Sequence, residues 1–457
     1  MKRSGIWARS MKHIRKLRPT SMILLGFFAV IVLGALLLSL PMSSRTPGTT
    51  DFFTALFTAV SAVSVAGLTL VDTYYHWTLF GQGVVLLLIQ IGGLGFMSLI
   101  SIFYFLLKKR IGLRERLMMM ESLNLDEMEG VVALVRRVLI GTLLFELVGA
   151  IVFSAHFIPE FGVMGGIWRG VFLAVSAFCN AGFHIMGSHQ MFSGMDTYAA
   201  SPAMLLTMAV LIVVGSTGFY VWEDLLKRRR FKSLHLHSKL VLVITGILIA
   251  LGTMMYFLLE SQNPSSIGNL PLGDRILLSL FQSISTRTGG FDVIGQLTLM
   301  EDTRMLSIPF MFIGGSSGSA AGGIKTVTVG VLILSAISVL RGSRDLVVFE
   351  KRIDQTQIIQ AATLASIGLI MALAGSVLLF RTDGVSLSDA LFETVSAYST
   401  AGLTIGVLDQ VGHLEKTLIM CYMFFGKIGV ITLSVAFMMK GHRPPGITYP
   451  AEHVIIG

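Results

Sequence analysis

Long apolar stretches recur along the whole chain, separated by short polar segments. Eight of them reach the length of about 20 helical residues that a hydrocarbon core of about 30 Å requires. The first follows a basic segment, as a signal peptide does, but it has full spanning length and no small-residue cleavage pattern. We therefore expect an all-α polytopic membrane protein. The predicted spans are residues 21–40, 79–107, 133–155, 202–225, 239–260, 304–339, 358–380 and 416–439.

Four further amphipathic stretches are too short to cross a bilayer. At about 1.5 Å per residue they extend only around 20 Å, so each is expected to enter the membrane and turn back. Each ends in a segment that carries a glycine, and these glycines are 115, 108 and 112 residues apart. The pattern predicts four copies of one unit, a membrane-pore-membrane repeat, arranged with pseudo-fourfold symmetry around one ion pore. The short stretches are residues 51–63, 168–178, 273–286 and 386–398.

The repeats define the predicted organisation of the chain. A basic N-terminal segment precedes the first repeat, and a short tail follows the fourth. The predicted parts are the N-terminus 1–20, repeat 1 over 21–107, repeat 2 over 133–225, repeat 3 over 239–339 with an interrupting loop at 314–325, repeat 4 over 358–440, and the tail 441–457.

The four glycine segments are the candidate ion-binding filter. Irregular backbone at membrane depth is tolerated only where it is buried in protein or faces water, and rings of backbone carbonyls can replace the hydration shell of an ion. The half-helices also direct the negative ends of their dipoles inward, which favours a cation. One such glycine alone is better explained by close packing or a tight turn, whereas four aligned copies argue against coincidence. The predicted filter residues are Val63, Ser64, Val65, Ala66, Gly67, Phe178, Cys179, Asn180, Ala181, Gly182, Thr286, Arg287, Thr288, Gly289, Gly290, Tyr398, Ser399, Thr400, Ala401 and Gly402.

The sixth predicted span is interrupted by ten consecutive Gly, Ser or Ala residues, followed by Ile324 and Lys325. Such a run is a poor helix, so we expect a break roughly 15 Å below the outer end of the span. Small residues also serve helix packing, and from composition alone the two interpretations are equally supported. The candidate gate residues are Gly314, Gly315, Ser316, Ser317, Gly318, Ser319, Ala320, Ala321, Gly322, Gly323 and Lys325.

Three ionisable residues lie at predicted membrane depth, namely Lys427, Glu146 and Lys325. Such groups are costly there and point to function. Lys427 is the candidate electrostatic barrier of the pore. For Glu146, an ion pair that serves only structure is as well supported as a transport role. Arg287, within the third filter segment, is expected to brace the filter rather than to bind the ion.

Charge supports a membrane protein with both termini in the cytoplasm. The chain is 53% hydrophobic and 13% charged, with a mean hydropathy of +0.77, which excludes an ordinary soluble protein. Of 35 Lys and Arg residues, 26 lie on the N-terminal side of the predicted spans and 35 − 26 = 9 remain for the other side and the membrane interior, as the positive-inside rule requires. The outer loops carry mainly acids, which predicts a vestibule attractive to cations, although most of these acids are individually explained as solvated residues or helix caps.

Several functional classes find no support. The basic residues are spread between spans, so the net charge of +9 does not indicate nucleic-acid binding. Two cysteines, Cys179 and Cys421, make neither a disulfide framework nor a metal site. No nucleophile, phosphate loop or paired carboxylate indicates an enzyme or a cofactor. A coupled secondary transporter of another small cation or solute is the alternative function; it predicts two repeats with paired breaks and intramembrane acids rather than four repeats.

From residue 20 to 457, the glycine segments and the interrupted span resemble the Trk/Ktr/HKT superfamily of potassium transporters, most closely the KtrB and KtrD type of bacterial membrane subunit. The resemblance implies potassium uptake through filter glycines Gly67, Gly182, Gly290 and Gly402, with the interrupted segment as a gate. A serine at the first position accompanies sodium selectivity in plant members, so Gly67 favours potassium.

The resemblance also implies partners and a location. The partners are a second copy of the chain in a homodimer, membrane lipids, and a cytoplasmic octameric ring of nucleotide-binding subunits of the KtrA or KtrC type. The location is the bacterial cell (inner) membrane. Activation by Na⁺ is left open by the sequence. The basic inner loops could dock that ring, although anionic lipid explains them equally well. Lys427 departs from the arginine usual in this family, and Val430 from a frequent proline. Both departures put the strength of the electrostatic barrier in question.

Overall fold

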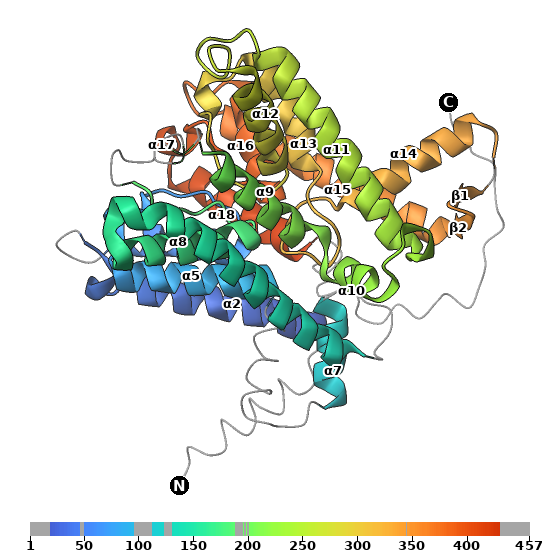
Figure 1. Ribbon diagram of the computed structural model, residues 1–457, viewed down its shortest axis with the longest axis horizontal. Helices are drawn as coiled ribbons and strands as arrows, with labels where there is room; N and C mark the ends of the chain where they lie inside the picture. The colour runs from blue at the N-terminus through green and yellow to red at the C-terminus, as the bar shows by residue number, and fades with distance from the viewer. Residues whose placement is uncertain are drawn as a thin grey trace.

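The computed structural model describes residues 19–45, 50–95, 112–122, 130–187, 195, 198, 201–343 and 345–429. These residues are mainly helical, as the apolar pattern predicts (Figure 1). The elements are α2 (Pro19–Leu38), η1 (Pro41–Ser43), α3 (Phe52–Ser64), α4 (Thr73–His76), α5 (Leu79–Leu94), α7 (Leu113–Ser122), α8 (Val131–Phe178), α9 (Pro202–Thr217), α10 (Phe219–Arg228), η3 (Phe231–Ser233), α11 (Leu236–Glu260), α12 (Leu272–Thr286), η4 (Gln296–Thr298), α13 (Glu301–Phe312), α14 (Thr326–Leu340), β1 (Leu346–Val348), β2 (Lys351–Ile353), α15 (Gln355–Phe380), α16 (Leu387–Ser399), α17 (Val407–Gln410) and α18 (His413–Ile428).

Four helices of the described chain are long and apolar enough to cross a membrane: α2, α8, α11 and α15. A fifth crossing exists only if α9 and α10 are counted together, and these two helices meet at an angle of 95°. The span expected over residues 202–225 is therefore sharply bent. Gly218 lies at the bend with φ 97° and ψ 136°, a conformation that favours glycine and ends the helix.

The span expected over 304–339 is interrupted where the sequence predicts a break. Helix α13 ends at Phe312 and α14 begins at Thr326, so the Gly/Ser/Ala run is a loop between them. The parts of the predicted spans 79–107 and 416–439 that follow residues 95 and 429 lie outside the described residues. At those two positions, Gly95 (φ 80°, ψ 148°) and Gly429 (φ 84°, ψ 142°) end α5 and α18 in nearly the conformation of Gly218.

The second span and the second half-helix were expected to be separate, at 133–155 and 168–178. The structure joins them in the element α8, which is broken at Gly162 (φ 73°, ψ 170°), three residues after Pro159. The helix thus continues past Pro159 to Phe161 and resumes directly after Gly162.

Each half-helix packs between longer helices. Helix α3 contacts α2 and α5, α12 contacts α11 and α9, and α16 contacts α15 and α18. Helices α2, α5 and α8 lie side by side on one flank, coloured blue to teal in Figure 1. One large apolar cluster unites these elements and surrounds the ends of the half-helices.

A short antiparallel hairpin, which the sequence pattern does not predict, joins α14 to α15. Val347 pairs with Arg352 in its register. Leu346 and Ile353 are buried with Leu240 of α11 in a second, smaller apolar cluster. This cluster holds the hairpin against the ends of the long helices (Figure 1).

Candidate functional site

The four glycines at the ends of the half-helices meet at one place in the fold. A Cβ atom added to Gly67 would lie 2.8 Å from the Ala181 carbonyl oxygen and 3.0 Å from Gly402 Cα. One added to Gly182 would lie 2.9 Å from Gly290 Cα, and one on Gly290 would lie 3.1 Å from the Ala401 carbonyl oxygen. The segments thus form a closed ring in chain order. Any side chain on a ring glycine would collide with backbone.

All four segments adopt the same alternation of backbone hand. The ring glycines have φ between 71° and 79°. Two residues before each of them lies a second residue in the left-handed region: Val65 (φ 56°), Asn180 (φ 59°), Thr288 (φ 68°) and Thr400 (φ 53°). Left-handed backbone costs a non-glycine residue about 1–2 kcal/mol, and backbone strain of this kind clusters at functional sites.

A cavity of about 340 Å³ lies directly against the ring and opens toward the loops that follow it. All four ring glycines line this cavity, which we call the vestibule. Two acids, Asp72 and Asp292, also line it. The described residues contain no group of three or more His, Cys, Asp or Glu side chains that could hold a metal ion.

The vestibule acids are also backbone caps. Asp72 accepts hydrogen bonds from the amides of Tyr74 and Tyr75, at 2.8 and 2.9 Å. Asp292 accepts from the amides of Gly295 and Gln296, at 2.9 and 2.8 Å. Asp72 is the N-cap of α4, as expected for outer acids, whereas Asp292 holds the turn before η4. Each also places a carboxylate beside the cavity.

A third carboxylate, which the sequence reasoning missed, holds the chain after the fourth ring glycine. Glu393 of α16 is fully buried. It accepts hydrogen bonds from the Thr404 hydroxyl at 2.9 and 3.1 Å and from the Ile405 amide at 3.4 Å. Thr404 lines the vestibule. The available signal was an acid in the interior of a half-helix that is expected to enter the membrane.

Hydroxyl groups attach the half-helices to the segments that follow them. Ser285 donates to the Phe291 carbonyl at 2.6 Å, and Ser396 donates to the Leu403 carbonyl at 2.6 Å. The Tyr256 hydroxyl of α11 lies 2.7 Å from the Thr286 hydroxyl. These buried bonds fix the backbone around the ring, since leaving such groups unpaired would cost about 1–3 kcal/mol each.

The Arg287 side chain points away from the ring, toward the base of the Gly/Ser/Ala loop. Its guanidinium lies 3.4 Å from the Gly314 carbonyl and 3.2 Å from the Thr326 hydroxyl. The Thr326 hydroxyl in turn donates to the Gly314 carbonyl at 2.9 Å. Arg287 therefore links the third glycine segment to the point where the loop begins and ends.

The loop lies on the opposite side of the ring from the vestibule, against the fourth glycine segment. A Cβ atom on Gly323 would lie 3.0 Å from Ser399 Cα. Backbone hydrogen bonds hold the loop to α9 on one side, where the Ser316 amide donates to the Ser216 carbonyl at 2.9 Å. On the other side the Gly323 amide donates to the Gly426 carbonyl of α18 at 3.3 Å.

Two lysines bind neighbouring carbonyls of this loop. Lys325 donates to the Ala321 carbonyl at 2.7 Å, and Lys427 donates to the Ala320 carbonyl. Both ammonium groups thus lie at the loop, on the side of the ring away from the vestibule.

Glu146 is separate from this group. It is buried on α8. In the part of the chain that the structure describes, it makes no ion pair with Lys427, Lys325 or any other base.

Comparison with known proteins decides the family. The family model described as "TrkH: Cation transport protein" matches residues 12–443. The chain belongs to the TrkH family. The "Potassium/sodium uptake protein NtpJ" of Enterococcus hirae is 36% identical over 452 residues, covering 98% of this chain and 99% of that protein. The "Ktr system potassium uptake protein B" of Bacillus subtilis is 37% identical over 439 residues, covering 96% of this chain and 97% of that protein.

A solved structure shares the TrkH-family fold. The potassium transporter TrkH from Vibrio parahaemolyticus aligns with a TM-score of 0.67 at 16% identity, covering 91% of this chain and 85% of that chain. The predicted fold class, an all-α membrane protein with a repeated pore-forming architecture, is confirmed, as is the resemblance to the Trk and Ktr transporters.

Proposed function

We propose that this chain is the ion-translocating membrane subunit of a Ktr-type potassium uptake system. The observation that supports it best is the closed ring of Gly67, Gly182, Gly290 and Gly402 at the base of one acidic vestibule. A ring of backbone carbonyls with no ligating side chain suits a weakly hydrated monovalent cation, because the carbonyls replace its water shell without a strong charge that would trap it. The names of two full-length relatives, both potassium uptake proteins, support potassium as that ion.

The Gly/Ser/Ala loop is the proposed gate. It lies across the path beneath the ring, and Lys325 and Lys427 add positive charge there. Its hydrogen bonds to α9 and α18 make it an ordered plug rather than a free segment. Opening therefore requires movement of the helices that hold it, which couples the gate to whatever moves those helices.

The positive-inside rule places both termini in the cytoplasm of a bacterial cell. There a homodimer of the chain would meet a ring of nucleotide-binding subunits of the KtrA or KtrC type; the name "Ktr system" carried by the Bacillus relative supports such a partner. Activation by Na⁺ stays a prediction, supported only by the name of the Enterococcus relative.

The test is growth of a strain that lacks its own potassium uptake, on limiting potassium, with and without a regulatory subunit. The proposal expects the chain to restore growth, and the regulatory subunit to copurify with it and make its flux respond to nucleotide. Failure to restore growth at normal membrane expression would contradict potassium uptake. Full, unregulated flux from the chain alone would contradict the partner.

A further inference from the structure

A cavity of about 630 Å³ lies far from the vestibule, between α7 and the beginning of α8. Its mouth carries three arginines, Arg116, Arg136 and Arg137, all exposed. Its wall is aliphatic and is formed by Val131, Val132, Ala133 and Ile140. Under the topology proposed above, this cavity opens at the inner surface of the membrane.

The charge of the mouth is largely unneutralised. Among the described residues, neither Arg116 nor Arg136 has an ion-pair partner. Arg137 pairs with Glu223 of α10. The same Glu223 oxygen lies 2.7 Å from the Lys227 ammonium, so Glu223 keeps a positive partner if Arg137 turns toward a ligand.

The aliphatic wall continues along α8 as an exposed apolar ridge. Ile140, Leu143, Leu144 and Leu147 are each between 57% and 64% exposed. Their spacing of three and four residues places them on one helix face. A ligand that fills both the basic mouth and this ridge needs an anionic head and an apolar tail.

We infer that the cavity is a binding site for an anionic phospholipid, with the phosphate at the arginines and an acyl chain along the ridge. Arginine is suited to phosphate because its planar fork binds two oxygens at once. Basic pockets between membrane helices on the cytoplasmic side recognise such headgroups.

The site is connected to the proposed gate through α10. Glu223 lies about one helical turn after Phe219. The Phe219 amide donates to the Gly318 carbonyl of the loop at 2.9 Å. A phosphate that withdraws Arg137 from Glu223 therefore acts on the helix whose first residue holds the loop, and bound lipid should change the rate of ion flux.

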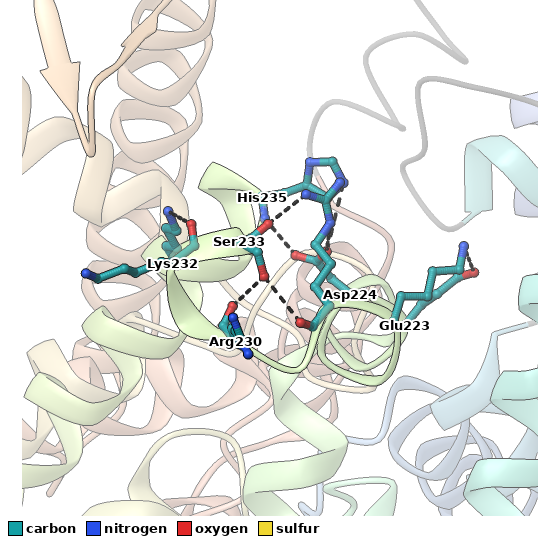
Figure 2. Close-up of polar contacts among 9 residues, drawn as sticks. Glu223, Asp224, Arg230, Lys232, Ser233 and His235 are labelled. Atoms are coloured by element: carbon teal, nitrogen blue, oxygen red, sulfur yellow. Dashed lines mark hydrogen bonds and ion pairs between the residues drawn. The ribbon is translucent and has the colours of Figure 1, made fainter.

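The end of α10 is braced separately from this edge. Figure 2 shows Asp224 directed toward the turn at Ser233 and His235, while Glu223 points away from it. Asp224 accepts from the His235 amide at 2.8 Å and pairs with Arg228 at 3.0 Å. The turn thus stays anchored when Glu223 changes partner.

The test uses the full chain and titrates phosphatidylglycerol or phosphatidylcholine by native mass spectrometry. The double variant R116Q/R136Q should bind phosphatidylglycerol roughly 25-fold more weakly, about fivefold per arginine. The matched control R229Q/R230Q removes the same charge from the exposed turn after α10 and should change binding less than twofold. Ala133→Trp places a large side chain in the cavity and keeps all the arginines. It should also abolish the preference for phosphatidylglycerol over phosphatidylcholine.

Three results would overturn the inference. One is equal loss in R116Q/R136Q and R229Q/R230Q, which would indicate only general surface charge. Another is binding of glycerol phosphate as tight as that of phosphatidylglycerol, which would show that the site does not hold an acyl chain. The third is that R116Q/R136Q binds phosphatidylglycerol as the parent does but no longer binds a regulatory subunit, which would assign the surface to a protein. All three are separable from a failure of potassium uptake, because lipid binding is measured without transport.

Discussion

The most informative substitution replaces a ring glycine by serine in the fourth repeat. At Gly402, φ is 79°, and a Cβ atom would lie 2.8 Å from the Ala66 carbonyl oxygen and 2.9 Å from Gly290 Cα. The left-handed backbone costs a serine about 1–2 kcal/mol, and crowding against backbone that cannot rotate away adds about 1–3 kcal/mol. Because the crowded atoms include a ring carbonyl, relief of this strain shifts the groups proposed to bind the ion.

A matched control separates the two costs. Gly406 has φ 84°, but a Cβ atom there would meet nothing within 4 Å. Gly406→Ser therefore carries the backbone cost alone, and Gly402→Ser carries both. The difference, about 1–3 kcal/mol, sets the largest loss of preference for potassium over sodium expected in Gly402→Ser, roughly 5- to 150-fold.

The assay is rubidium uptake in competition with sodium, at matched protein in the membrane. Gly67→Ser, where φ is 77° and the Ala181 carbonyl oxygen would lie 2.8 Å from the Cβ atom, should behave like Gly402→Ser. Unchanged selectivity in both variants at normal expression would refute the assignment of the filter.

Three further predictions follow from the surroundings of the ring. Deleting Ser316–Ala321 removes the carbonyls that Lys325 and Lys427 bind. Ion flux into liposomes should therefore rise sharply and respond less to nucleotide, while potassium selectivity stays largely intact. A folded deletion variant that conducts no faster than the parent would show that the segment serves only packing. Glu393→Gln should lower the free energy of unfolding by about 1–3 kcal/mol in thermal unfolding, because it loses an acceptor for Thr404 or Ile405. The control Asp383→Asn, at an exposed position, should be neutral. Equal effects of the two substitutions would count against the bracing role of Glu393. Burial lowers the pKa of His76, in the outer loops, from its usual 6.5. Protonation therefore favours the unfolded state, and stability should fall as the pH drops below about 6.5 toward the lowered pKa. His76→Gln should weaken this pH dependence of stability, and an unchanged pH profile in the variant would refute the prediction.

The sequence located the glycine segments because their spacing is regular, and it located the interrupted span because ten small residues make a poor helix. The neighbours of each glycine could not be predicted from the sequence, because Gly67 lies beside Gly402 and Ala181 only after four distant segments converge. Spacing therefore indicated a ring without its geometry.

Other features depend on contacts between repeats. The bend at Gly218 was not predicted. The Phe219 amide that follows it donates to the Gly318 carbonyl of the loop, a contact that the sequence does not show. Glu393 was missed because its partners Thr404 and Ile405 lie on the far side of the ring segment. The roles expected for the three ionisable residues at membrane depth stay predictions. Lys427 and Lys325 lie at the loop, and Glu146 does not.

The central claim, passage of potassium through one uncoupled pore, is tested most directly by the steady-state distribution of potassium across liposomes that contain the chain and its regulatory subunit. The account predicts a distribution set by the membrane potential alone, unchanged when sodium or proton gradients are imposed or removed. A distribution that follows an imposed sodium or proton gradient at fixed potential would contradict it and indicate a coupled transporter.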